Sequence, residues 1–144
     1  MAENKQKPEE FNHITEKVIG CAFTVSNKLG SGFLEKVYEN ALALEIRKSG
    51  LNVKQQHPIL VFYDNEVIGE FVCDLLVENC VMVELKTVKN LDDIHMAQCL
   101  NYLRATGMQI CLLINFYKAR IEIKRIVNNF PAPYPKNMTS TNRQ

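Results

Sequence analysis

The chain has 144 residues, of which 47% are hydrophobic and 23% charged, and its net charge is +1. This size and balance predict one globular domain, and the near-neutral charge excludes a protein held to nucleic acid by overall charge alone. No apolar run approaches the roughly 20 residues that a membrane span needs, so we expect no membrane partner. The five scattered cysteines include no C-x-x-C pair, which argues against a disulfide framework or zinc knuckle and favours a cytoplasmic location.

Two helices are predicted near the start of the chain. Apolar residues recur with helical spacing over residues 11–29. A second helix is expected over residues 33–49, with Ser31 or Gly32 as its N-cap. Glycine favours the turn that ends a helix, and a glycine stands in that position after each of the two, Gly30 and Gly50.

The pattern then changes from helical to extended. Strands are expected at residues 53–63, 67–77, 81–88, 108–116 and 120–127, with a third helix from Asp92 or Asp93 to Ala105, ended by Gly107. Pro58 indicates an edge or a bulge in the first strand. The run 108–116 is nearly all apolar, which is typical of a strand covered on both faces.

This order, ααβββαββ, predicts an α/β fold with a mixed (α+β) sheet, in which the third helix is the crossover to a parallel strand. Residues 10–130 are expected to form a single domain. The start, residues 1–9, is polar and we expect it to be flexible. The tail, residues 131–144, is rich in Pro, Asn, Thr and Ser and is expected to be disordered.

The stretch 69–89, GEFVCDLLVENCVMVELKTVK, is predicted to be a hairpin that turns around Asn79. Equal steps outward from Asn79 pair Val77 with Val81 and, three steps further, Asp74 with Glu84. Two carboxylates would then have Cβ atoms roughly 5 Å apart. Their repulsion among apolar neighbours is costly unless a divalent cation lies between them. Because Lys86 projects from the same strand face as Glu84, the hairpin is interpreted as a metal site with an adjacent lysine.

The third predicted helix carries polar residues that can face this hairpin. His95, Gln98 and Tyr102 are spaced by three and four residues and therefore share a face. A glutamine amide and a tyrosine hydroxyl could orient the lysine or bind a phosphate oxygen. His95 stands near the helix start, where a histidine is more often structural than catalytic.

These motifs resemble a known family. Gly32-x-x-Glu35-x-x-Tyr38, followed by the D-x(9)-E-x-K series of Asp74, Glu84 and Lys86, is similar to the GxxExxY proteins of the PD-(D/E)xK nuclease superfamily. Gln98-x-x-x-Tyr102 also resembles the Q-x-x-x-Y element of the RecB-like exonuclease branch. The similarity covers about residues 10–127. Cys73 stands where the superfamily motif has proline.

The resemblance implies a restriction-endonuclease-like core and a divalent-metal-dependent nuclease, most simply one that acts on DNA. Asp74, Glu84, Glu35 and the backbone carbonyl of Leu85 would hold Mg²⁺, for which Mn²⁺ could substitute. Lys86 would position the attacking water or neutralise charge on the phosphate. Gln98 and Tyr102 would hold these groups in place or contact the phosphate.

Each feature also has a plainer interpretation. Glu35 suits the first turn of a helix, where acidic residues complement the helix dipole, and Tyr38 is expected to pack with its hydroxyl bonded. Gln98 and Tyr102 could form an ordinary solvated helix face. Asp74, Glu84 and Lys86 could be an ion-pair cluster without metal.

An alternative function is a catalytically silent nuclease-fold module that binds nucleic acid or a protein partner. The chain shows no helix-turn-helix signature, zinc finger or strong basic stripe. Its small size offers little surface for target selection, which favours a homodimer or a larger protein partner.

Overall fold

The computed structural model of the protein describes residues 8–129. Residues 1–7 of the expected flexible start and the whole of the expected tail, 131–144, lie outside this range. A short 3-10 helix, Pro8–Phe11, precedes the first α-helix.

A five-stranded mixed sheet forms the centre of the described part of the chain. Its strands lie in sequence order: β1 (Val53–Tyr63), β2 (Glu66–Val77), β3 (Val81–Lys86), β4 (Ile110–Asn115) and β5 (Glu122–Val127). All neighbours are antiparallel except β3 and β4, which are parallel. The helix α3 (Asp93–Thr106) connects this parallel pair. The mixed sheet and its helical crossover confirm the fold predicted from the sequence.

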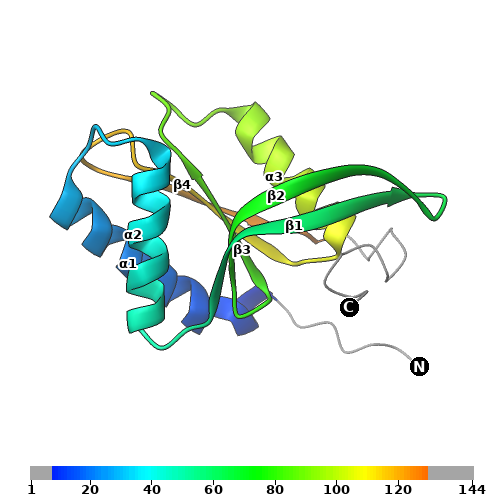
Figure 1. The fold of residues 1–144 in the computed structure, drawn as a ribbon, viewed down its shortest axis with the longest axis horizontal. Helices are drawn as coiled ribbons and strands as arrows, with labels where there is room; N and C mark the ends of the chain where they lie inside the picture. The colour runs from blue at the N-terminus through cyan, green and yellow to red at the C-terminus, as the bar shows by residue number, and fades with distance from the viewer. Residues whose placement is uncertain (1–7, 130–144) are drawn as a thin grey trace.

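Helices cover both faces of the sheet. The helices α1 (Asn12–Leu29) and α2 (Glu35–Lys48) lie on one side and α3 on the other, while the β1–β2 hairpin extends away from them (Figure 1). In β4, Leu112 packs in the core beneath α1 and α2, and Leu113 packs in the core beneath α3. All six residues of β4 are buried, which explains why this strand is apolar at nearly every position.

The ends of the elements follow the sequence, apart from the start of α2 and shifts of about two residues at several strand ends. The helix α3 is capped by Asp92, whose side chain accepts a hydrogen bond from the amide of Ile94, and it ends at Gly107 in a left-handed conformation, as predicted. However, α2 begins at Glu35, and its N-cap is Leu34, which has no capping side chain. The prediction of a Ser31 or Gly32 cap was therefore wrong. The third strand ends at Lys86, two residues earlier than expected.

The side chains of β1 and β2 exchange faces partway along the hairpin. Leu75 packs beneath α1 and α2, yet Cys73, two residues earlier, packs beneath α3. The same exchange occurs in β1 between Val53, which packs on the first core, and Ile59, which belongs to the second. Since residues two apart in a regular strand share a face, both strands must be distorted between these positions.

This distortion is centred where Gln56 of β1 lies between two paired positions. Gln55 pairs with Leu75 and His57 pairs with Cys73, so the register is the same on both sides. Gln56 has a left-handed backbone with φ of 51°, a conformation that is uncommon for residues other than glycine. The residue of β2 between Cys73 and Leu75 is Asp74, so the twist redirects the strand at this aspartate.

Candidate active site

A cavity of about 280 Å³ opens where β2, β3, α3 and the first turn of α2 meet. It is lined by all six side chains that the sequence singled out for chemistry, Glu35, Asp74, Glu84, Lys86, Gln98 and Tyr102, together with Phe71, Val72, His95 and Cys99. Segments separated by more than 60 residues are thus brought to one place, because α3 returns across the sheet after β3.

The two central carboxylates reach this cavity from neighbouring strands. The predicted pairing of the hairpin is present from Val77 and Val81 to Leu75 and Val83, and the predicted pair of Asp74 with Glu84 lies just beyond the last of these pairs. The turn residues Glu78 and Asn79 both have left-handed backbones, as a tight hairpin turn requires. Beyond Leu75 the amide of Leu85 donates a hydrogen bond to Oδ2 of Asp74 at 2.9 Å.

The Glu84 carboxyl group lies in an unfavourable electrostatic environment. The residue is only 9% exposed, and its Oε1 atom has no hydrogen-bond partner among the described residues. Burial, followed by the negative charge of Asp74, raises the pKa of Glu84 to about 9. Burial also raises the pKa of Asp74, although the hydrogen bond from the Leu85 amide lowers it in part. The pKa of Glu35 is raised by burial and further by the negative charge of Asp74.

A metal-free cluster of ion pairs does not account for these charges. None of the ion pairs within residues 8–129 joins Lys86 to Asp74 or Glu84. The lysine lines the same cavity but leaves the carboxylates unneutralised by direct contact. With a pKa of about 9, Glu84 is protonated at neutral pH in the metal-free protein, whereas a divalent cation bound between the two groups would favour its ionised form.

The donor atoms present suit a hard divalent cation. Glu84, whose Oε1 has no hydrogen-bond partner among the described residues, lines the same cavity as Asp74. Within the described residues no three His, Cys, Asp or Glu side chains form a ready ligand group, so protein carboxylates alone do not complete a coordination shell. Mg²⁺ matches such a site because it is commonly held by one or two carboxylates and keeps several waters.

The helix α3 supplies the opposite wall of the cavity. Its first turn is fixed by His95, whose Nδ1 accepts a hydrogen bond from the Asp92 amide at 3.1 Å. His95 therefore takes part in the N-terminal cap of α3, in line with the expectation that a histidine near a helix start is structural. The Tyr102 ring stacks on Phe71 with ring centroids 3.6 Å apart. This stacking fixes the position of the tyrosine at the cavity wall.

Tyr38 holds the loop that leads into α2. Its side chain is fully buried, its hydroxyl donates to the Gly30 carbonyl at 2.7 Å, and the hydroxyl oxygen accepts from the Phe33 amide at 3.3 Å. Its ring stacks on Phe116 at 4.7 Å. The expectation that Tyr38 packs with a bonded hydroxyl is thus met. The loop is fixed so that Glu35, the first residue of α2, lines the cavity.

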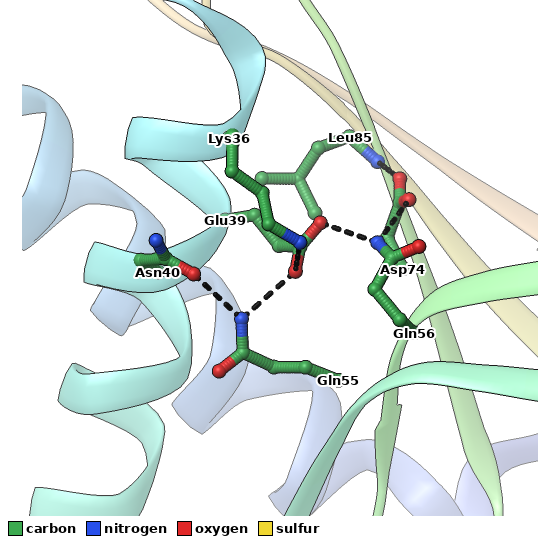
Figure 2. A network of polar contacts seen from close by, with 7 residues as sticks. All are labelled: Lys36, Glu39, Asn40, Gln55, Gln56, Asp74 and Leu85. Atoms are coloured by element: carbon green, nitrogen blue, oxygen red, sulfur yellow. Dashed lines mark hydrogen bonds and ion pairs between the residues drawn. The ribbon is translucent and has the colours of Figure 1, made fainter.

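A second set of polar residues, not predicted from the sequence, lies behind Asp74. Figure 2 shows Glu39 of α2 linked through Gln56 to Asp74, with Lys36 and Gln55 also bound to Glu39. The available signal was the four-residue spacing from Glu35, which places Glu39 on the same side of the helix. Nothing in the local sequence indicates the side-chain direction of Gln56.

Comparisons with known proteins agree with this geometry. A family model of the PD-(D/E)XK nuclease superfamily, whose members generally use divalent metal ions, matches residues 12–126. The crystal structure of SSO0001 is similar to this fold, with a TM-score of 0.51 and 16% sequence identity over 86% of this chain and 62% of that one. This chain thus spans less than two thirds of that protein.

An alkaline exonuclease (LHK-Exo) from Laribacter hongkongensis is also similar, with a TM-score of 0.49 and 15% identity over 87% of this chain and 72% of that one. No curated protein matches the chain. Within residues 8–129 there is no helix of the length and hydrophobicity that crossing a membrane demands.

The family match covers most of the sequence and includes every residue that lines the cavity. The chain therefore belongs to the PD-(D/E)XK nuclease superfamily.

Proposed function

We propose that the protein is a divalent-metal-dependent nuclease of the GxxExxY group that hydrolyses phosphodiester bonds in DNA. The observation that carries this proposal is the buried pair of Asp74 and Glu84 in one cavity with Lys86, with an unpartnered Glu84 oxygen facing no protein donor. Five free cysteines support a cytoplasmic location. The small size of the chain supports action as a homodimer or with a larger partner.

The carboxylates of Asp74 and Glu84, which line the cavity, would hold Mg²⁺ or Mn²⁺ together with the backbone carbonyl of Leu85, and Glu35, which also lines the cavity, would bind through water. When bound, such an ion polarises a phosphate and lowers the pKa of a coordinated water. Lys86 lies beside the carboxylates, where its ammonium group can orient the attacking water and neutralise charge that develops on the phosphate. Gln98 and Tyr102 donate hydrogen bonds from the α3 wall to phosphate oxygens.

The first test is a cleavage assay on linear and circular DNA, both single- and double-stranded, and on RNA, with Mg²⁺, Mn²⁺ or EDTA. The Asp74→Asn variant should lose metal-dependent cleavage by at least about 100-fold, since it removes a ligand charge at the centre of the site. Glu70→Gln is the matched control, because Glu70 is an exposed acid on the same strand and should retain full activity. Cleavage of circular substrates would identify an endonuclease.

The role of Lys86 needs a separate variant. Lys86→Ala should lose about 100-fold or more in rate while it still binds Mn²⁺, because the lysine acts on the phosphate and not on the ion. Lys17→Ala, at an exposed position of α1, serves as the control. A Lys86→Ala protein that cuts at the wild-type rate would rule out this assignment. Absence of both cutting and Mn²⁺ binding in the wild type would favour a catalytically silent binding module.

A further inference from the structure

Both oxygens of the Asp74 carboxylate are held by hydrogen bonds from neighbouring strands. On one side the Leu85 amide of β3 donates to Oδ2 at 2.9 Å. On the other side Nε2 of Gln56, in β1, donates to Oδ1 at 3.3 Å. The orientation of this carboxylate is therefore set from two directions before any cation or substrate arrives.

The amide of Gln56 is itself anchored by Glu39. Its Nε2 donates to Oε1 of Glu39 at 2.6 Å, while the other Glu39 oxygen accepts from Lys36 at 3.0 Å and from Gln55 at 2.8 Å (Figure 2). Glu39 is only 3% exposed. Because ionised carboxylates only accept hydrogen bonds, the nitrogen of Gln56 and not its oxygen must face both Asp74 and Glu39.

The backbone at Gln56 is strained in a way that its side chain explains. A φ of 51° at a residue other than glycine is a sparsely populated, strained conformation. This conformation lies where β1 and β2 exchange faces, opposite Asp74. Glycine would adopt it at no steric cost, yet the chain has glutamine there. Strain of this kind persists where the surroundings demand a particular side chain.

We propose that Gln56, anchored by buried Glu39, is a positioning residue that orients Asp74 toward the metal and the scissile phosphate. This inference rests on the proposed function, in which Asp74 is a metal ligand. Gln56 acts through Asp74 and does not itself contact the reacting atoms. Without Gln56, the Asp74 carboxylate would lose conformational freedom each time a metal ion binds. Because this ordering costs free energy, the affinity for the metal ion would fall.

The test compares Gln56→Gly with Gln55→Ala. Glycine relieves the backbone strain but leaves Oε1 of buried Glu39 without its donor, so the melting temperature of each variant is measured to show that it is folded at the titration temperature. Calorimetric titration should show Mn²⁺ binding weakened by about 10- to 100-fold, the usual effect of removing a group that orients a metal ligand. Gln55→Ala removes a different hydrogen bond to Glu39 and touches no atom of Asp74, so its Mn²⁺ affinity should match the wild type. Equal Mn²⁺ affinity in Gln56→Gly and wild type would overturn the proposal.

A second readout needs no metal. In EDTA, the NMR resonance of the Leu85 amide proton reports its hydrogen bond to Asp74. This resonance should move upfield in Gln56→Gly and stay in place in Gln55→Ala. If the wild type bound no Mn²⁺, the proposed function would fail. The Leu85 resonance would then decide the positioning role alone: a shift in Gln56→Gly supports it, and an unchanged resonance rejects it.

Discussion

At the scale of single residues, the Glu84 carboxyl group sets how the protein responds to pH. It is buried, it faces Asp74, and the only lysine that lines its cavity forms no direct ion pair with it among the described residues. Burial and the neighbouring charge raise its pKa from the ordinary 4.5 to about 9. An acid whose pKa is raised in the folded state stabilises the fold fully below its ordinary pKa, and this stability is lost as the pH rises through the folded value.

We therefore predict that, in EDTA, the melting temperature of the wild-type protein falls as the pH rises from neutral toward 9. Glu84→Gln should show a flatter profile and melt at a higher temperature at the alkaline end, because glutamine cannot ionise. Mg²⁺ added at alkaline pH should restore the wild type and leave Glu84→Gln nearly unchanged. If the melting temperatures of the two proteins changed with pH in parallel in EDTA, the claim that ionisation of Glu84 destabilises the fold would be contradicted.

At the same scale, the sequence predicts some residues around the cavity and not others. That Asp74, Glu84 and Lys86 lie together could be predicted from the hairpin around Asn79, whose register is confirmed from Leu75 to Val83. The hydrogen bonds of Glu39 and Gln56 behind Asp74 could not be predicted from the sequence. Their contact joins a helix to a strand 17 residues away, and the left-handed backbone of Gln56 has no glycine or asparagine to signal it.

At the scale of elements, the loop that leads into α2 depends on a side chain of the helix itself. The sequence offers Ser31 and Gly32 as caps, but the Tyr38 hydroxyl donates to the Gly30 carbonyl and accepts from the Phe33 amide. The helix begins at Glu35 with no capping side chain. By contrast, the ends of α3 were predictable, because Asp92 and Gly107 act within the local chain.

This dependence predicts the effect of removing a single hydroxyl group. Tyr38→Phe keeps the ring stacked on Phe116 and leaves two backbone groups without their partner, so it should lower the free energy of unfolding by about 1–3 kcal/mol. Urea denaturation measures the change. Tyr63→Phe, at a position that is 66% exposed, should be neutral. A neutral result for Tyr38→Phe would show that the loop is held by packing alone.

At the scale of the whole molecule, two separate cores pack on the sheet, and Phe71, Cys99 and Tyr102 of the core beneath α3 line the cavity. One core lies beneath α1 and α2 and the other beneath α3, and the central strands contribute alternate residues to each. The order of elements and the crossover were readable from hydrophobic periodicity. The exchange of faces at Gln56 and Asp74 was not, because a regular strand pattern assumes that alternation continues.

The long β1–β2 hairpin has a consequence for how the protein opens. Only Leu75 to Val77 of β2 pair with β3, whereas β2 pairs with β1 along nearly its whole length. Near the turn, Tyr63, Val67 and Ile68 are all more than half exposed. Amide hydrogen exchange should therefore be faster by orders of magnitude at the outer end than at Leu75 to Val77, since the tip can unzip while the core stays folded. Equal protection along the hairpin would contradict this independence. Unequal protection would make the tip a place where the chain tolerates change without loss of structure at the cavity.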